Sequence, residues 1–172
     1  MTIKRYCFYC GTPLERVGEA EGHFRLVCPA CHAKFYKNPI PAVAALVVKG
    51  EELLLVKRAA PPLVGSWCLP GGFIESGEDV SEALARELYE ETGLRVKSSR
   101  LMDVISYVDE NPEGKGVIII GYRVEAFEGN PRPGDDAQEV KFFPLTDLPP
   151  IPFSSHVALI GKIKEGKPGV YH

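Results

Sequence analysis

Three glutamates and an arginine stand at helical spacing near the middle of the chain. Glu87, Glu90 and Glu91 occupy positions i, i+3 and i+4, so a helix would place their carboxylates on one face. Such a patch repels itself unless a cation binds, and carboxylate oxygens with room for water suit Mg²⁺ or Mn²⁺ better than Zn²⁺. Arg86, four residues before Glu90, can neutralise part of the charge. These residues predict a metal site that could bind a pyrophosphate.

Local signals predict the helix that would position these side chains. Asp79 followed by Glu82 is a plausible capping box, and Gly93 suits the residue just beyond a helix. Alanine and leucine between them supply helix formers and an apolar side. The helix is therefore bounded at both ends by its own sequence.

Residues 72–94 resemble the Nudix box, Gly-x5-Glu-x7-Arg-Glu-U-x-Glu-Glu-x-Gly-U, in which U is a bulky apolar residue. The nine matching positions are Gly72, Glu78, Arg86, Glu87, Leu88, Glu90, Glu91, Gly93 and Leu94. The alternative is an ordinary solvated acidic helix, which a long motif matched at fixed spacing disfavours. The resemblance implies a Nudix hydrolase with an α/β/α sandwich around a mixed sheet, in the α/β or α+β class.

The resemblance also implies roles for individual residues. Glu78 would pair with Arg86 as a brace. Glu87 and Glu91 would be the principal Mg²⁺ ligands, with Glu90 as a third ligand, direct or through water. The backbone carbonyl of Gly71 would be a further donor. The expected catalytic set in the box is Arg86, Glu87, Glu90 and Glu91.

The general base lies outside the box in several branches of such enzymes, and the box does not locate it. The stretch 134–139, just before an expected strand, is the best candidate loop. Glu139 is the first choice for a base or an additional metal ligand, and Asp136 is the second. The alternative is a solvated acidic turn.

Four of the five cysteines form two Cys-x-x-Cys pairs separated by seventeen residues. The ligands would be Cys7, Cys10, Cys28 and Cys31. This spacing predicts a zinc ribbon, in which four thiolates close a structural Zn²⁺ site. Two disulfides or redox-active dithiols are the alternatives. We expect the ribbon to span residues 1–37 and the Nudix domain to span 38–172. The fifth cysteine, Cys68, is expected to be a buried thiol.

Composition sets further bounds. The 172 residues are 45% hydrophobic, enough for a real core, and the net charge is −3. That total gives no general attraction to nucleic acid or to an anionic membrane, although it does not exclude a local basic patch. No apolar run is long enough to span a bilayer, and no apolar signal core is present. We expect a soluble cytoplasmic protein, and the resemblance implies a homodimer.

Alternating apolar runs predict strands on both sides of the box helix. The expected strands are 42–48, 53–57, 95–97, 101–108, 117–127 and 140–143, the first two joined as a hairpin through 49–52. A second helix is expected from Ser154 or Ser155 to about Glu165, with either serine as its N-cap. Strands around one strong helix suggest a mixed sheet covered by helices.

A zinc ribbon followed by a Nudix domain resembles NADH pyrophosphatases and a set of ADP-ribose and FAD pyrophosphatases. The NADH signature Ser-Gln-Pro-Trp-Pro-Phe-Pro-x-Ser is not matched, since residues 150–155 read Pro-Ile-Pro-Phe-Ser-Ser. The expected substrate order is therefore ADP-ribose, then FAD, then NADH. Aromatic residues that could stack on the nucleotide, if they do not simply pack, are Phe35, Tyr36, Tyr107 and Phe153.

A different class of function stays open, in which the ribbon docks RNA or protein and the Nudix domain processes an RNA cap. Against RNA, the acidic residues of the ribbon offset its basic ones, so no basic stripe with interleaved aromatics stands out. The residues compared are Glu15, Glu19 and Glu21 with Arg16, Arg25 and Lys34. A small-molecule nucleotide without nucleic acid is the preferred expectation.

Overall fold

The computed structural model describes residues 5–18, 24–36, 38–108, 116–134 and 136–164. The chain divides into two compact units, Met1–Asn38 and Pro39–His172. Each unit has its own buried core, so each is described by itself.

Unit 1 is a three-stranded antiparallel sheet with two cysteine knuckles. Its strands are β1 (Glu15–Gly18), β2 (Phe24–Val27) and β3 (Lys34–Phe35), in the order β1-β2-β3. In the first knuckle the Gly11 amide donates to the Cys7 carbonyl over 2.7 Å, and in the second the His32 amide donates to Cys28 over 2.9 Å. Gly11 and His32 have φ values of 74° and 59°. The two knuckles therefore share one turn geometry, although only the first has the glycine that this geometry favours.

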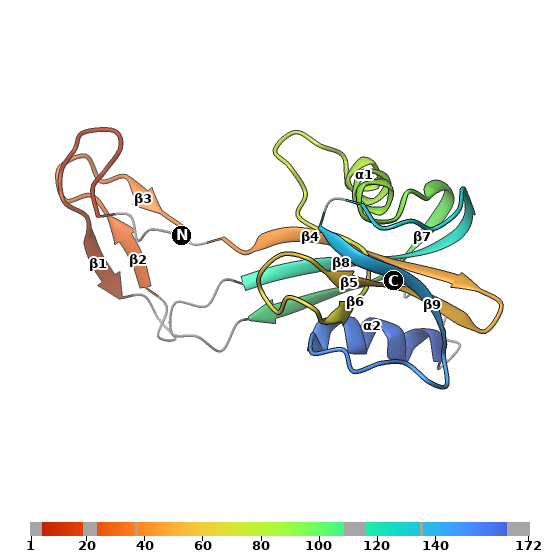
Figure 1. The fold of residues 1–172 in the computed structure, drawn as a ribbon. Coiled ribbons are helices and arrows are strands. Elements are labelled where there is room, and N and C mark those ends of the chain that lie inside the picture. The colour runs from red at the N-terminus through yellow and green to blue at the C-terminus, as the bar shows by residue number, and fades with distance from the viewer. Residues whose placement is uncertain (1–4, 19–23, 37, 109–115, 135, 165–172) are drawn as a thin grey trace. The chain divides into compact units, whose positions relative to one another are not determined.

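Unit 2 is built on a mixed sheet (Figure 1). Its strands are β4 (Ile40–Lys49), β5 (Glu52–Arg58), β6 (Trp67–Cys68), β7 (Arg95–Val108), β8 (Gly116–Glu128) and β9 (Ala137–Pro144). The strand order is β6-β5-β4-β8-β7, and β9 also pairs with β5. The β4–β8 pair is parallel, whereas β4–β5, β5–β6, β5–β9 and β7–β8 are antiparallel.

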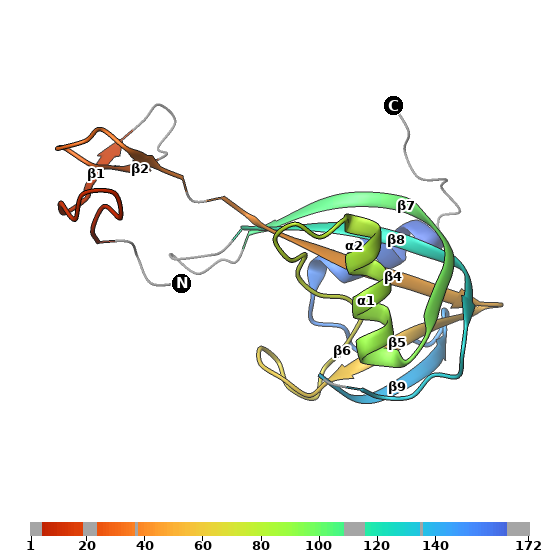
Figure 2. The same ribbon diagram turned by 90° about the horizontal axis from the view of Figure 1, so that it is seen from above.

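Two helices cover opposite faces of this sheet, α1 (Val80–Thr92) on one and α2 (Ser154–Lys164) on the other (Figures 1 and 2). Strand β4 is buried on both faces, so its alternate residues enter different cores. The core on the α1 side contains Val43, Ala45, Val47, Leu54, Ala83, Leu84, Leu88, Leu94 and Val124. The core on the α2 side contains Ala42, Ala44, Leu46, Leu53, Leu55, Leu69, Ile119, Leu159 and Ile160. The predicted sandwich of two helical layers around a mixed sheet is confirmed.

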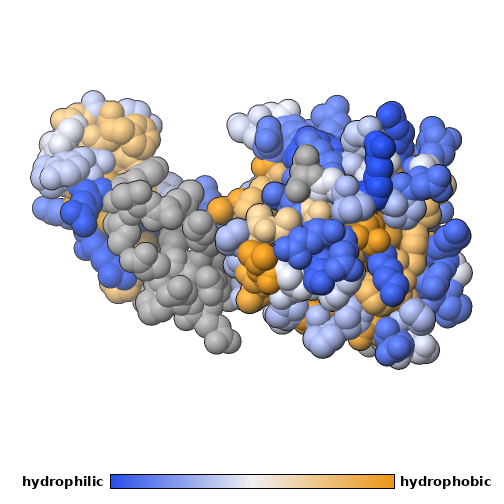
Figure 3. Space-filling model, in the orientation of Figure 1, coloured by the Kyte–Doolittle hydropathy of each residue, from blue (hydrophilic) through white to orange (hydrophobic). Residues whose placement is uncertain are grey.

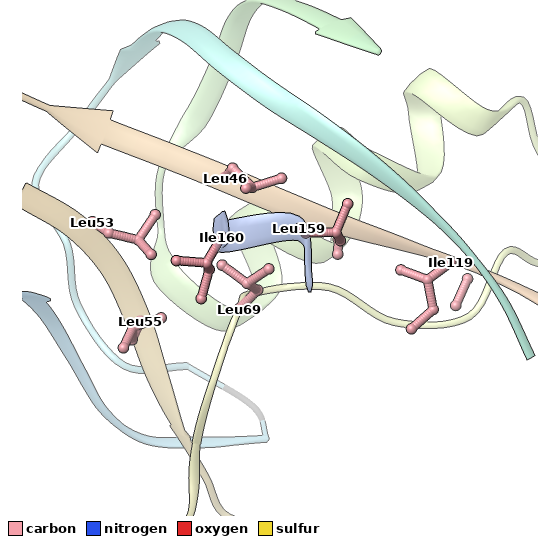
Figure 4. Close-up of a cluster of buried hydrophobic side chains, with 9 residues drawn as sticks. Leu46, Leu53, Leu55, Leu69, Ile119, Leu159 and Ile160 are labelled. Atoms are coloured by element: carbon pink, nitrogen blue, oxygen red, sulfur yellow. The ribbon is translucent and has the colours of Figure 1, made fainter. Parts of the chain in front are cut away.

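Figure 4 shows how the second core holds α2 on the sheet. Leu159 and Ile160 of α2 lie among Leu46 of β4 and Leu53 of β5, and all four side chains are at most 4% exposed. Burying a leucine or isoleucine side chain contributes about 1.5–3 kcal/mol. A few such contacts are therefore enough to fix the position of a short helix.

Several predicted elements are confirmed, and two differ in detail. The hairpin forms with Lys49 opposite Glu52. The two predicted strands after the box are one strand, β7, whose pairing with β8 shifts register near Ser98 and Met102, so irregularities stand where the sequence suggested a break. The second helix begins at Ser154 itself, so neither serine precedes it as a cap. In the described part of the chain, no helix is long and apolar enough to cross a membrane.

Candidate functional site

The segment before the box runs alongside β4 and forms one wall of the site. The Val43 amide donates to the Gly72 carbonyl over 2.9 Å, and the Ala45 amide donates to the Pro70 carbonyl over 2.8 Å. Gly71 lies between them with a φ of 148°, and a β-carbon there would overlap the Val43 carbonyl oxygen. Among the described residues the Gly71 carbonyl receives no hydrogen bond. An oxygen without a donor in this position is open to a cation.

The box helix α1 has the ends that the sequence predicted. The Asp79 side chain accepts from the Ser81 amide, the Glu82 side chain accepts from the Asp79 amide over 3.2 Å, and the two form a capping box. Gly93 follows the helix in the left-handed conformation, with φ of 70°. The helix buries Leu84 and Leu88 against the sheet, which fixes which of its faces carries the glutamates.

Arg86 connects three carboxylates and one carbonyl. Its guanidinium donates to both oxygens of Glu78, over 2.7 and 2.9 Å, and to the Phe73 carbonyl over 3.1 Å. It also donates to Glu87 over 2.8 Å and to Glu90 over 3.2 Å. The hydrogen bonds from Arg86 hold the pKa of Glu78 down at about 2, so this carboxylate stays ionised. The implied Glu78–Arg86 brace is confirmed, and it ties the turn before the helix to the acidic face.

Glu91 is the most buried carboxylate of the box, with 8% of its surface exposed. Its Oε2 accepts from the Gly71 amide over 2.9 Å, which joins α1 to the segment along β4. Burial and then the charge of Glu87 raise the pKa of Glu91 to about 7. A carboxylate held out of water beside another negative charge is poised to exchange its proton for a cation.

Glu87 packs directly on the backbone of Gly72. A β-carbon at Gly72 would overlap the Glu87 carboxylate, so a larger residue there would push this side chain out of its position. Burial raises the pKa of Glu87 as well, against the lowering effect of Arg86. Glu87 and Glu91 therefore face the same short backbone segment, Gly71–Gly72, and both are less easily ionised than a carboxylate in water.

The two carboxylates proposed for the region after the box lie in different environments. Glu139 is on β9 opposite Lys57 of β5, and their side chains form an ion pair of 2.7 Å. Phe143, four residues further along β9, packs in the core on the α2 side. Because side chains alternate along a strand, Glu139 points to the same face, the one that carries α2. Asp136 precedes the strand, and its charge raises the pKa of Glu91. Of the two residues, Asp136 is the one whose charge is among the main influences on the pKa of Glu91.

Arg58 was not singled out from the sequence, and the structure places it near Glu91. Its charge acts to lower the pKa of Glu91. It donates to the carbonyls of Pro61 and Pro62, over 3.2 and 2.8 Å, and its guanidinium lies 5.7 Å from the ring centre of Phe153. A cation at the end of an apolar strand, just before a proline-rich loop, is the sequence signal that could have drawn attention to it.

A cavity of about 200 Å³ opens beside the end of α1. It is lined by Tyr89, Glu90, Gly93, Arg132, Pro133 and Gly134. The loop that closes it is fastened to the helix, since the Arg132 amide donates to the Thr92 carbonyl and the Gly134 amide to the Glu91 carbonyl. Arg132 of this loop lines the cavity. Like Arg58, it was not singled out from the sequence.

In unit 1 the four predicted zinc ligands come together. The sulfur atoms of Cys7, Cys10, Cys28 and Cys31 all lie within 4.8 Å of one another, and three of the pairs are 3.4, 3.6 and 3.7 Å apart. All five cysteines of the chain are free rather than disulfide-bonded. Tetrahedral Zn²⁺ with Zn–S bonds of about 2.3 Å requires sulfurs about 3.8 Å apart. The cluster therefore fits a zinc ion.

The fifth cysteine, Cys68, is 2% exposed, and burial raises the pKa of its thiol to about 11. It is the buried thiol that the sequence predicted, and its raised pKa disfavours the reactive thiolate.

The glutamate face of α1, its arginine brace and the mixed sheet between two helices define a class of protein. Residues 38–159 of this chain match the sequence model of the NUDIX domain family. The chain belongs to this family and is a Nudix hydrolase.

Two curated relatives bear on the particular activity. This chain is 42% identical over 120 residues to the ADP-ribose pyrophosphatase of Methanocaldococcus jannaschii. The aligned segment covers 70% of each protein. It is 30% identical over 158 residues to the NAD-capped RNA hydrolase NudC of Pseudomonas aeruginosa, covering 90% of this chain. The chain spans about half the length of that second relative, 52%.

Solved structures support the fold. A NUDIX hydrolase from Nitrosomonas europaea matches with a TM-score of 0.71 at 25% identity, over 98% of this chain and 97% of its own. A MutT NUDIX hydrolase from Burkholderia pseudomallei matches with a TM-score of 0.69 at 28% identity, over 73% of this chain and 98% of its own. The match to the first of these includes the part of the chain that forms unit 1.

Proposed function

We propose that this Nudix hydrolase cleaves the pyrophosphate bond of an ADP-linked nucleotide in the presence of Mg²⁺ or Mn²⁺, with ADP-ribose as its preferred substrate. The observation that carries the proposal is the buried Glu91, joined to Gly71 and next to Glu87, because this pairing of carboxylates and an open carbonyl suits a hard cation. The 42% identity to an ADP-ribose pyrophosphatase supports the choice of substrate. The products would be AMP and ribose 5-phosphate.

The residues that would hold the ion are Glu87, Glu91 and the carbonyl of Gly71, with Glu90 at the more exposed edge. Bound there, the ion would neutralise charge on the pyrophosphate oxygens. Arg86 touches Glu87 and Glu90 but is also fixed to Glu78, so its role is to hold these carboxylates in position. Anchoring by a bidentate arginine keeps the acidic face ordered before the ion binds.

Hydrolysis also requires a base that takes a proton from the attacking water. Of the two carboxylates considered, we assign this role to Asp136 in preference to Glu139. The charge of Asp136 raises the pKa of Glu91, whereas Glu139 is ion-paired with Lys57 on the side of the sheet that carries α2. Arg58 lies in the same region and is proposed to contact a substrate phosphate.

Residues 1–37 are proposed to be a zinc-ribbon domain, and residues 38–172 are proposed to be the Nudix domain that follows it in the sequence. The Zn²⁺ of the ribbon would be structural, because four thiolates leave no open position for water or substrate.

A substrate panel tests the proposed reaction. Purified protein is assayed with ADP-ribose, FAD, NADH, dinucleoside polyphosphates and NAD-capped RNA, with Mg²⁺ and with Mn²⁺. The highest kcat/KM is expected for ADP-ribose, and release of AMP and ribose 5-phosphate identifies the bond that is cleaved. Absence of hydrolysis of every pyrophosphate with either ion would contradict the proposal.

A second candidate is removal of a nicotinamide–adenine dinucleotide from the 5′ end of RNA. It is supported by the similarity to an NAD-capped RNA hydrolase over 90% of this chain, a span long enough to include at least part of unit 1. The same catalytic residues would serve, because the bond is again a pyrophosphate. A kcat/KM for capped RNA above that for ADP-ribose would favour this candidate.

A further inference from the structure

Unit 1 exposes large aromatic side chains on its surface. Tyr6, Phe8, Tyr9, Phe24 and Tyr36 are between 56% and 72% exposed. Hydrophobic residues lie beside strongly hydrophilic ones on the visible surface of this unit (Figure 3). Clustered exposed apolar side chains mark interaction sites, because a folded protein otherwise gains by burying them. The zinc cluster accounts for the core of the unit but not for these rings.

Two of these exposed rings, Phe8 and Tyr9, pack together at the first knuckle and against the buried ring of Phe35. The ring centres of Phe8 and Tyr9 are 4.5 Å apart, and that of Phe8 is 5.0 Å from the buried Phe35. Phe8 and Tyr9 are themselves 65% and 72% exposed. These contacts hold two rings in fixed orientations while their outer sides face water, which lowers the entropy cost of binding another flat group.

A further ring lies on the same face of the sheet and carries an arginine. Leu26 pairs with Phe35 in the register of β2 and β3, so Phe24, two residues along β2, points to the face where Phe35 and Phe8 lie. The guanidinium of Arg16 lies 3.8 Å from the centre of the Phe24 ring. We call this surface, formed by Phe8, Tyr9, Arg16 and Phe24, the knuckle face.

The charge of unit 1 differs in sign from that of unit 2. The three acidic and three basic residues compared in the sequence offset one another, but Lys4, Arg5 and Lys37 were left out of that comparison. With them, residues 1–38 contain six lysines and arginines against three glutamates, a formal charge of +3, so the remaining residues carry −6 of the total of −3. Four thiolates with one Zn²⁺ would contribute −2, which leaves the unit positive. Positive charge combined with exposed rings is the combination that binds single-stranded nucleic acid. The structure thus groups aromatics and cations that looked unrelated in the sequence.

We infer that the knuckle face binds single-stranded RNA. Bases stack on Tyr9, Phe8 and Phe24, and Arg16 contacts a phosphate from its position over the Phe24 ring. The choice of RNA over DNA rests on the second function proposed above, whereas the surface itself is observed independently of the catalytic site. Stacking reads no particular base, so binding is expected to be insensitive to sequence and to weaken with salt.

The test is titration of a short unstructured RNA, labelled at its 3′ end, with the full chain, followed by fluorescence anisotropy. Tyr9→Ala and Phe24→Ala are each expected to weaken binding about tenfold. Arg16→Gln is expected to weaken binding and to lower the slope of log Kd against log salt by about one. Val104→Ala also removes an exposed apolar side chain, but in unit 2, so it is the control and should bind like the wild type.

Two measurements on the same samples keep the outcomes distinct. Zinc content and hydrolysis of free ADP-ribose should be unchanged in all four variants, which shows that unit 1 is folded and the catalytic site intact. Absence of saturable RNA binding by the wild type, or equal binding by all variants, overturns the inference without affecting the proposed hydrolysis. So does a dimer that the knuckle-face variants dissociate while RNA binding is unchanged, because the surface would then join two copies of the chain.

Discussion

Glu91 combines burial, a hydrogen bond to the backbone and a neighbouring negative charge. Most exposed glutamates of a helix make none of these contacts, and their loss has little effect on stability. Burying the charged form of Glu91 costs free energy, and a cation bound during the reaction would offset that cost. Its substitution therefore distinguishes a metal ligand from a member of a solvated acidic face.

Glu91→Gln is expected to lower the turnover of ADP-ribose by about 100-fold or more, because it removes charge from the proposed ion site in a dry environment. Folding should be retained, since the glutamine oxygen can still accept from the Gly71 amide. The measurement is kcat at saturating Mg²⁺, with Glu82→Gln as control. Glu82 lies on the same helix, and its glutamine can still accept from the Asp79 amide. Equal activity of the two variants would remove Glu91 from the ligand set.

The raised pKa of Glu91 also predicts a pH dependence of stability without added Mg²⁺ or Mn²⁺. Its folded pKa of about 7 lies above its ordinary value of 4.5, so its contribution is fully present below pH 4.5 and is lost as pH rises through about 7. The loss is about 3 kcal/mol. Urea unfolding followed by the fluorescence of Trp67, the only tryptophan, should show a smaller decrease between pH 5 and pH 8.5 for Glu91→Gln than for the wild type. A decrease of the same size in both proteins would mean that Glu91 titrates normally.

At the scale of elements, the site depends on the position of the segment between β6 and α1. The amide of Leu69, at the start of this segment, donates to Nδ1 of His156 in α2 over 3.1 Å. Burial, followed by the charge of Arg58, lowers the pKa of His156 to about 4. One neutral imidazole thus connects the helix on one face of the sheet to the chain that enters the box.

His156 predicts acid sensitivity with the opposite sign to that of Glu91. Its folded pKa lies below its ordinary value of 6.5, so its contribution is present above pH 6.5 and is lost as pH falls through about 4. His156→Gln keeps an acceptor for the Leu69 amide but does not titrate. The urea midpoint of the wild type should therefore fall more steeply than that of His156→Gln between pH 7 and pH 4.5. Parallel curves would show that the imidazole is not buried in its neutral form.

At the scale of the whole molecule, two metal sites would serve different purposes. The cysteine cluster and the glutamate face belong to different units, each with its own core. A segment as short as unit 1 buries too little apolar surface to be stable alone, so a structural zinc would supply much of its folding free energy.

Metal analysis is expected to give about one zinc per chain. Cys7→Ser should lose zinc and reduce the solubility or folding of unit 1, because Cys7 is buried in the core of that unit. Its remaining ADP-ribose hydrolysis should need the same Mg²⁺ concentration for half-maximal rate as the wild type. A stable variant with an altered Mg²⁺ requirement would show that the two sites are coupled, and disulfides among the four cysteines of freshly purified protein would exclude the zinc site.

What the sequence determined by itself lies within short stretches of chain. The capping box at Asp79, the glycine after the helix and the Glu78–Arg86 brace all join residues at most eight positions apart. Each Cys-x-x-Cys knuckle is equally local, and the zinc site then requires only that the two knuckles come together. Helix periodicity and knuckle turns repeat wherever such residues occur, so spacing alone predicted the helix and the knuckles. The Glu78–Arg86 brace was predicted from the resemblance to the Nudix box.

The tertiary structure decided how distant segments share the site. The hydrogen bond between Gly71 and Glu91 spans twenty positions, and that between Leu69 and His156 spans 87. The pairing of β9 with β5 put Glu139 opposite Lys57, on the face of the sheet away from α1. A shift of one residue in that pairing would turn its side chain to the other face, and no local signal in the sequence fixes the register. The burial that raises the pKa of Glu91 likewise exists only once α1 packs against the sheet, because desolvation is a property of the assembled fold.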